Sequence, residues 1–338
     1  MDIIKKSPAS KKEWIIMTIV SIIILLAFNS SFFYKPITAE AWLAFFLLFV
    51  AMFVLNEISR RSLWAGIGSF IILPIVFLIF VWPYTSEGTN MDNWFSHAKI
   101  ISVSTACIIF IALRYSKRVQ GWNWYKILPP LILAVNIWEA VSREFEISHM
   151  LPHVEDGMTY MGGGWNTANA WAGIINIIII CGWFGIFVSK DKHKTMLWPD
   201  MLWYWVVAYD LWNFTYAYNC VGDRSFYVFP VLFAATLATH FIRKGAWVQH
   251  RAHTLAWAQY IMFTFPELFV NSSIRVESSW NVNAMWFLSI TALVFNLGVL
   301  VYQIYLIVKH KRNPLKDELY VEHQEYQELM AHEKTFNN

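Results

Sequence analysis

Acidic residues interrupt three of the long apolar segments in this sequence. Glu139, Asp210 and Glu267 each lie within or at the end of a mainly apolar run, and Lys99 interrupts a fourth. A charge at the centre of a membrane helix costs roughly 3 kcal/mol, so such residues need a compensating role. A carboxylate in this setting binds a cation, carries a proton, or pairs with a buried base. We expect the three acids to converge with Lys99 around one cavity, with one acid paired to the lysine.

Amide and aromatic side chains accompany these charges at helical spacing. The expected substrate-binding residues are Asp210, Glu139, Glu267, Lys99, Asn136, Trp212, Asn213 and Asn166. Asp210 is the first choice for ligand contact, because an aromatic stripe of Trp205, Tyr209, Trp212 and Tyr216 lies beside it. Such rings suit an organic cation or a flat heterocycle. The alternative is that these groups serve only hydrogen bonding and packing between helices.

Other reactive side chains form no catalytic pattern. Cys220 lies in a turn with no neighbouring histidine to activate it. His250 and His253 are spaced to share a metal, but no third ligand is indicated. A weaker metal or proton-sensing group comprises His149, His153, Glu155 and Asp156. We therefore predict no catalytic residue, no metal site and no cofactor.

The elements that carry these residues are apolar segments of about 18–24 residues. At 1.5 Å per residue this length crosses the roughly 30 Å hydrocarbon core of a bilayer. The segments are 14–33, 38–56, 63–82, 95–113, 127–147, 165–188, 197–217, 225–242, 247–270 and 283–308. A hydrophobic fraction of 57%, with only 14% charged residues, excludes an ordinary soluble domain. The sequence predicts an all-α, polytopic membrane helix bundle of about ten transmembrane helices.

Positive charge alternates between the connections of these segments. Most of the 26 Lys and Arg residues fall on one side, and the other side receives only Lys35, Arg143, Arg224 and Arg275. The positive-inside rule then puts both termini in the cytoplasm. We predict a cytoplasmic segment 1–13, a transmembrane domain 14–308 and a charged cytoplasmic tail 309–338 in a multi-pass protein of the cell membrane. The basic residues share no common face, so nucleic acid is not an expected partner.

Polar residues concentrate in the outer halves of several predicted helices, while the inner halves are apolar. This asymmetry predicts a cavity that opens to the outside. A transporter or permease for a small solute, cationic or aromatic, fits best, with the lipid bilayer and a coupling proton or cation as further partners. The alternatives are a membrane-embedded enzyme acting on a lipid or isoprenoid, and a ligand-sensing receptor. An enzyme would need a nucleophile–base or metal constellation, and a receptor would typically carry a larger output domain.

Overall fold

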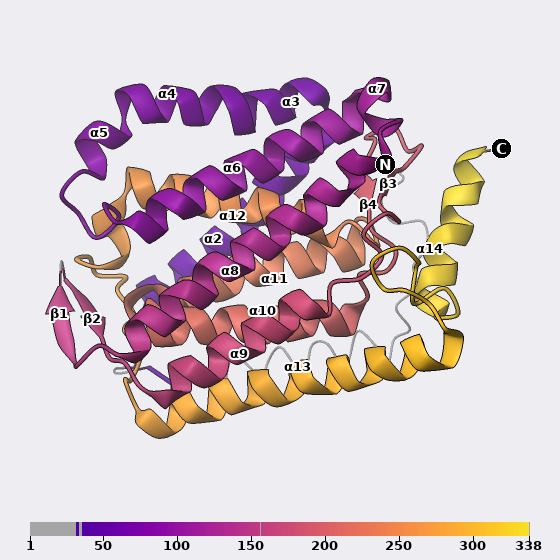
Figure 1. The fold of residues 1–338 in the computed structure, drawn as a ribbon. Coiled ribbons are helices and arrows are strands. Elements are labelled where there is room, and N and C mark those ends of the chain that lie inside the picture. Colours follow the sequence, from indigo (N-terminus) through magenta and orange to yellow (C-terminus); the bar gives the residue numbers. More distant parts are fainter. Residues whose placement is uncertain (1–31, 34–35, 156, 338) are drawn as a thin grey trace.

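Long helices running side by side make up most of the computed structural model, which describes residues 32–33, 36–155 and 157–337 (Figure 1). The long helices are α2 (Ala39–Arg61), α6 (Trp94–Tyr115), α8 (Leu128–Ser148), α9 (Gly164–Ile178), α10 (Trp203–Cys220), α11 (Ser225–Phe241), α12 (Trp247–Thr264) and α13 (Val282–His310). A further rod consists of α3 (Leu63–Ile67), the π-helical η1 (Gly68–Ile72) and α4 (Leu73–Phe80). The predicted segments 1–13 and 14–33 lie outside the described residues, apart from Phe32 and Phe33.

Short elements connect the long helices. The helical ones are α5 (Trp82–Thr85), α7 (Lys117–Gln120), η2 (Asn123–Ile127), η3 (Gly222–Arg224), η4 (Pro266–Phe269), α14 (Gln324–Lys334) and η5 (Thr335–Asn337). Two antiparallel strand pairs complete the fold: β1 (His153–Glu155) with β2 (Met158–Tyr160), and β3 (Phe187–Val188) with β4 (Met196–Leu197).

Polar side chains fix where three of the long helices begin. Thr38 Oγ1 accepts the N–H of Ala41 at the start of α2, at 3.2 Å. Asn93 Oδ1 accepts the N–H of Ser96 at 2.9 Å, and Asn281 caps α13 in the same way. Each cap satisfies an N–H group that the first turn of a helix cannot bond internally. These helix starts are therefore local consequences of the sequence.

Four helical segments of the described chain are long and apolar enough to cross a membrane: α2, Leu63–Phe80, α6 and α13. A fifth candidate is α10 with η3 and α11, which is bent by 117° at the break. Their outer faces expose large apolar side chains; Leu47 of α2 is 60% exposed and Phe80 of α4 is 67% exposed. Apolar faces of this extent are costly in water and favourable in lipid. The fold is a mainly helical bundle with the character of a membrane protein.

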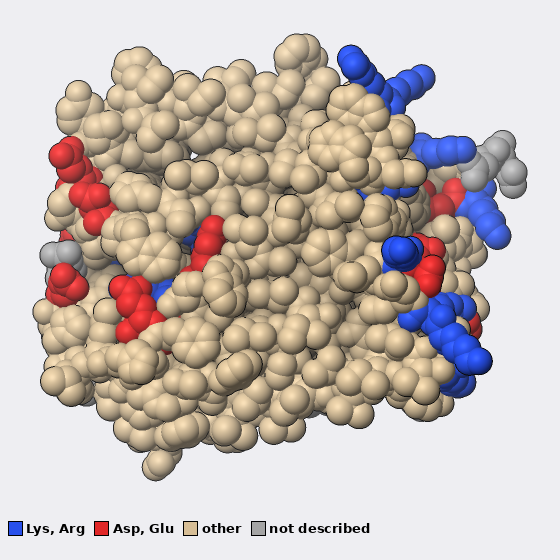
Figure 2. Space-filling view, viewed as in Figure 1, with Lys and Arg blue, Asp and Glu red and all other residues tan. Residues whose placement is uncertain are grey.

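Charged side chains lie mainly at two ends of the molecule (Figure 2). Lys and Arg gather where α7, β3, β4 and α14 lie (116–127, 179–202 and 311–337), which we call the Lys/Arg-rich end. The opposite end carries α5 and the β1–β2 hairpin (81–93 and 149–163), and its visible charges are mainly Asp and Glu. We call it the acid-rich end. The band between the two ends is largely uncharged, as a surface in contact with lipid chains must be.

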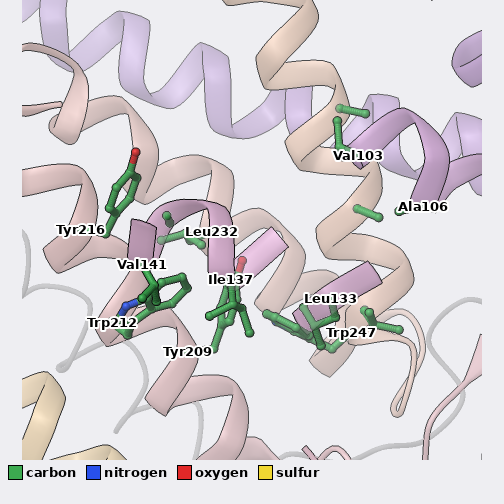
Figure 3. Close-up of a cluster of buried hydrophobic side chains, with 14 of the residues drawn as sticks. Val103, Ala106, Leu133, Ile137, Val141, Tyr209, Trp212, Tyr216, Leu232 and Trp247 are labelled. Atoms are coloured by element: carbon green, nitrogen blue, oxygen red, sulfur yellow. The ribbon is translucent and has the colours of Figure 1, made fainter. Parts of the chain in front are cut away.

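Aromatic and aliphatic side chains form a buried cluster within the bundle (Figure 3). Trp205 and Tyr209 of α10 stack with 5.7 Å between their ring centroids, and Trp247 of α12 meets Tyr209 edge-on at 4.8 Å. Trp212 lies beside Val141 of α8 and is fully buried. Rings in offset or edge-on contact stabilise a core beyond their buried area. The aromatic stripe expected beside Asp210 therefore serves mainly to pack α10 against its neighbours.

Helix α9 ends ten residues before the predicted limit of segment 165–188, at Ile178. After it, Gly182 has φ +63° and its N–H donates to the carbonyl of Pro314 at 2.9 Å. A Cβ on Gly182 would lie 2.7 Å from the Cβ of Asp200, so only glycine fits there. This long-range contact turns the chain into β3 and β4. The next predicted segment, 197–217, consequently becomes helical only at Trp203.

Helix α12 also ends early, at Thr264, whereas the sequence predicted a helix over 247–270. Pro266 has no N–H for the helical ladder and disfavours helical geometry at Phe265, which has φ −130°. Glu267 then lies in a 3₁₀ turn rather than within the predicted helix.

Residues 311–337 fold back against the Lys/Arg-rich end. The carboxylate of Asp200 accepts the N–H groups of Leu319 and Tyr320 at 2.6 and 3.0 Å. Arg243, after α11, forms an ion pair with Glu333 of α14. The predicted charged tail is thus attached to the bundle by hydrogen bonds and ion pairs.

Candidate functional site

A cavity lies between α6, α8, α10, α11 and α12, with about 1130 Å³ of empty space when its open side is included. Its lining extends from Asn90, Tyr160 and Arg224 at the acid-rich end to Arg251 in the second turn of α12. A smaller cavity of about 350 Å³ shares Asn136 and Arg251 with it and continues between apolar side chains of α6, α8 and α12. Together they extend through much of the bundle interior.

Lys99 of α6 and Glu139 of α8 form an ion pair at the wall of the larger cavity. The Nζ atom lies 2.9 Å from Glu139 Oε2 and donates to the carbonyl of Asn136 at 2.7 Å. Ser102 donates to the same carboxylate at 3.1 Å and accepts from the Asn136 amide at 3.2 Å. Both charged side chains are almost buried. The hydrogen bonds around the pair offset part of the cost of removing two charges from water.

Arg251 of α12 lies deeper in the cavity. The Nη2 atom of its guanidinium is 3.5 Å from Asn213 Oδ1, and its Cζ atom is 5.8 Å from the ring centroid of Tyr209. Its Nε and Nη1 atoms have no hydrogen-bond partner among the described groups. Arg251 is only 4% exposed and is close enough to Lys99 for electrostatic interaction. Lys99 is paired with Glu139, whereas the acid that acts on Arg251, Asp210, does so without a close ion pair.

A second positive group lies nearer the acid-rich end. Arg143 of α8 is 2.8 Å from the carboxylate of Glu146, and its Cζ is 5.4 Å from the ring centroid of Tyr160. Arg224 of η3 is buried, donates to Asn90 Oδ1, and contacts the sulfur atoms of two methionines. Both arginines line the cavity.

The structure brings together only part of the residue set expected from the sequence. Lys99, Asn136 and Asn213 line the cavity, and Glu139 is attached to it through Lys99. The predicted acid that pairs with Lys99 is therefore Glu139. The expectation that three carboxylates converge is wrong, because neither Asp210 nor Glu267 lines the cavity.

Asp210 faces α11 instead. Its Oδ2 atom accepts the hydroxyl of Thr236 at 2.7 Å, and the same hydroxyl oxygen accepts Trp247 Nε1 at 3.2 Å. Since α10 begins at Trp203 at the Lys/Arg-rich end, Asp210 lies in the half of the helix nearer that end. The residue that the sequence favoured for ligand contact therefore does not line the cavity.

Glu267 and Trp212 are also separated from the cavity. Glu267 is exposed and accepts a hydrogen bond from Asn271, four residues later. The cause is the helix end at Pro266, which removes Glu267 from α12. Trp212 is fully buried against α8 and α9; a Cβ on Gly173 would lie 2.5 Å from its indole nitrogen.

Asn166 is part of a polar cluster that the sequence analysis missed. The side-chain amides of Asn166 and Asn169 each donate to one carboxylate oxygen of Glu144, both at 2.6 Å. Glu144 and both asparagines are fully buried between α8 and α9. The shared face of the two asparagines was visible in the sequence, but their common acceptor was not. Asn166 also approaches Cys220 Sγ at 3.5 Å, and Cys220 lines the cavity.

The histidine pair of α12 has a structural environment. Nδ1 of His253 lies 3.1 Å from Asn56 Oδ1, and Nδ1 of His250 lies 2.9 Å from Asn56 Nδ2. Both rings are buried. No cluster of three or more His, Cys, Asp or Glu side chains with metal-binding geometry occurs in the part of the chain that the structure describes.

Comparison with known proteins identifies a family but no activity. A protein-family model, that of a family of unknown function (DUF5692), matches residues 35–332. No curated protein and no solved structure matches the chain significantly.

Proposed function

We propose that this chain, which belongs to the family of unknown function DUF5692, is a multi-pass transporter or permease that moves a small solute across the cell membrane. The cavity between α6, α8, α10, α11 and α12 carries this proposal. Charged residues within a membrane bundle are retained mainly where they line a pathway or a water-filled cavity. Lys99 and Arg251 are such residues, located on two helices that face each other across the cavity.

The smaller cavity supports transport over simple binding. It shares Asn136, Arg251 and Leu255 with the larger one and extends between Phe110 and Val248, nearer the Lys/Arg-rich end. A solute path needs access to both sides of the membrane in turn, around a central site. In this proposal, Arg251 stands where the two cavities meet, and movement of α12 or α10 would open the apolar part of the path.

The proposed topology has about ten spans, with both termini in the cytoplasm and the acid-rich end outside. The supporting observation is the enrichment of Lys and Arg at one end of the described chain (Figure 2). Reporter fusions at Arg118 and Lys192 should read cytoplasmic, and a fusion at Glu155 should read external. An external reading at Lys192 would contradict the topology.

Two other classes compete with transport. A membrane-embedded enzyme acting on a lipid or isoprenoid would use the same cavity, and Cys220 is the nucleophilic side chain in its lining. Cys220 is buried beside the carboxylate of Glu144, and burial together with a neighbouring negative charge makes it a poor nucleophile. A ligand-sensing receptor would bind a solute without moving it.

A single series of measurements separates the three classes. Purified full-length protein is screened by thermal shift against amines, nucleosides, amino acids, sugars and organic acids, because a ligand at 100 times its Kd stabilises a protein by about 2.7 kcal/mol. Each stabilising compound is then tested for uptake into proteoliposomes, with and without a proton or sodium gradient. Transport predicts saturable uptake of the unchanged compound. Conversion to a product identifies an enzyme, and binding without uptake contradicts transport.

A further inference from the structure

We propose that the cavity binds an organic anion with a carboxylate or phosphate head and an apolar body. Transport of this anion would rest on the proposed function, whereas binding of the anion does not depend on that function. The proposal also departs from the sequence-based expectation of a cationic solute.

The cavity lining is positive. Lys99, Arg143, Arg224 and Arg251 belong to it, whereas none of the described residues that line it is an Asp or Glu. Two of these cations are matched by acids of α8 outside the lining: Lys99 by Glu139 at 2.9 Å, and Arg143 by Glu146 at 2.8 Å.

The other two cations lack such a match. Among the described residues, no carboxylate lies within ion-pair distance of Arg224 or Arg251. Asp210 interacts electrostatically with Arg251, and Asp223 and Glu267 interact with Arg224, but only at longer range. Asp223 forms its close ion pair with Arg275, at 2.6 Å. Each unmatched arginine lies near a matched cation. Arg251 is close to Lys99, while Arg224 and Arg143 both act on Tyr160. Buried charges without a partner are costly, so an anion bound between them would stabilise the cavity.

The unpartnered polar atoms of the lining are hydrogen-bond donors. Buried side-chain atoms with no hydrogen-bond partner in the described chain include Arg224 Nε, Arg251 Nε and Nη1, Asn90 Nδ2 and the hydroxyl of Tyr216. All four residues line the cavity and are at most 6% exposed. Guanidinium groups donate in a planar fork that matches carboxylate and phosphate oxygens. A cationic ligand would leave these donors unsatisfied.

The rest of the lining selects an apolar body. Side chains of α11 and α12 contribute a large part of it: Tyr227, Val228, Val231, Leu255, Ala258, Ile261 and Met262. Phe95 of α6 also lines the cavity. A pocket of this kind uses a few polar groups to orient a ligand and apolar contacts to hold its remainder. Inorganic anions would leave this surface unused.

The test measures binding to the full-length protein in phosphatidylcholine nanodiscs. The anionic probes are benzoate, octanoate and phenyl phosphate; benzyl alcohol and benzylamine are the neutral and cationic counterparts of similar shape. We expect the anions to bind at least tenfold more tightly than either counterpart. Tighter binding of benzylamine, or no binding by any of the three anions, would overturn the proposal.

Variants locate the site. Arg224→Met and Arg251→Met should each weaken binding of the best anionic probe at least tenfold. Arg118→Met is the matched control, because Arg118 is exposed at the Lys/Arg-rich end and stacks on Trp122; it should leave the affinity unchanged. If Arg251→Met fails to fold, Arg251→Lys is used in its place. Arg251→Lys keeps the positive charge but loses the planar guanidinium donors, so we expect an intermediate loss of affinity for the anion. Unchanged affinity in folded variants of both arginines would show that the cavity is not the anion site.

Two further measurements distinguish a lipid anion from a soluble one, and a failure of the anion site from a failure of the transport proposal. If an anionic lipid is the natural occupant, phosphatidylglycerol in the nanodiscs should compete with benzoate and weaken its binding. If the occupant is a soluble anion, phosphatidylglycerol should leave benzoate binding unchanged. Either result supports the anion site. If the anion binds but is not taken up into proteoliposomes, the anion site is supported and the transport proposal is rejected. Uptake of benzylamine without anion binding rejects the anion site and keeps transport.

Discussion

The ammonium nitrogen of Lys99 lies 2.9 Å from a carboxylate oxygen of Glu139, and both side chains are nearly buried between α6 and α8. This pair leaves Arg251, on the facing wall, as a cation without a matching acid among the described residues. At this point the cavity therefore has one positive charge in a close ion pair and a second, Arg251, without one.

Removing one member of the Lys99–Glu139 pair should destabilise the protein more than removing both. Glu139→Gln leaves a buried ammonium uncompensated, and such changes cost about 3–5 kcal/mol. The double variant Lys99→Met with Glu139→Gln should recover much of that loss. Thermal unfolding of the single and double variants in one detergent gives the coupling energy. Strictly additive losses in melting temperature would mean that the two charges do not interact.

Glu144→Ala should lower the free energy of unfolding by several kcal/mol. Both carboxylate oxygens accept 2.6 Å hydrogen bonds from Asn166 and Asn169, and each buried donor left unpaired costs about 1–3 kcal/mol. Glu146→Ala, two residues later on α8, is the control; its partly exposed ion pair is worth at most about 1 kcal/mol. Equal melting temperatures for the two variants would contradict a structural role for Glu144.

Asp210→Asn should retain solute binding and fold normally. The amide oxygen still accepts the hydroxyl of Thr236, and Asp210 does not line the cavity. Asp210→Ala loses that acceptor and should lower the melting temperature, again with binding intact in the folded fraction. Binding of the best probe and thermal unfolding are measured on the same preparations. A folded Asp210→Asn protein that no longer binds would restore the ligand role expected from the sequence.

Asp200→Ala should release the C-terminal tail. Its carboxylate accepts two backbone N–H groups of the tail, from Leu319 and Tyr320, so its loss leaves both without their partner. We expect faster cleavage within 311–337 by limited proteolysis, with the helical bundle unchanged in melting temperature. Asp317→Ala provides the control, because Asp317 bonds only within the tail, to the N–H of Asn313. Equal cleavage rates would contradict the role of Asp200.

Much of the secondary structure was predictable because it depends on local sequence. Helices α6 and α8 begin and end within two residues of the predicted segments 95–113 and 127–147. The length of an apolar run and a capping residue such as Asn93 decide these limits. The early end of α9 was not predictable, because it depends on contacts between Gly182 and two residues distant in the chain, Asp200 and Pro314.

The sequence by itself determined which segments are apolar, which connections carry Lys and Arg, and that some charged residues interrupt the apolar segments. These are properties of composition and spacing, and they led to a helical membrane bundle with an internal polar site. Only the tertiary structure decided which face of each helix meets the cavity. Rotation of α10 directs Asn213 into the cavity and Asp210 toward Thr236, and packing of η3 against the β1–β2 hairpin buries Arg224. A helix can be rotated about its axis without changing its hydrophobicity, so the side-chain partners follow from packing between helices and not from the sequence pattern.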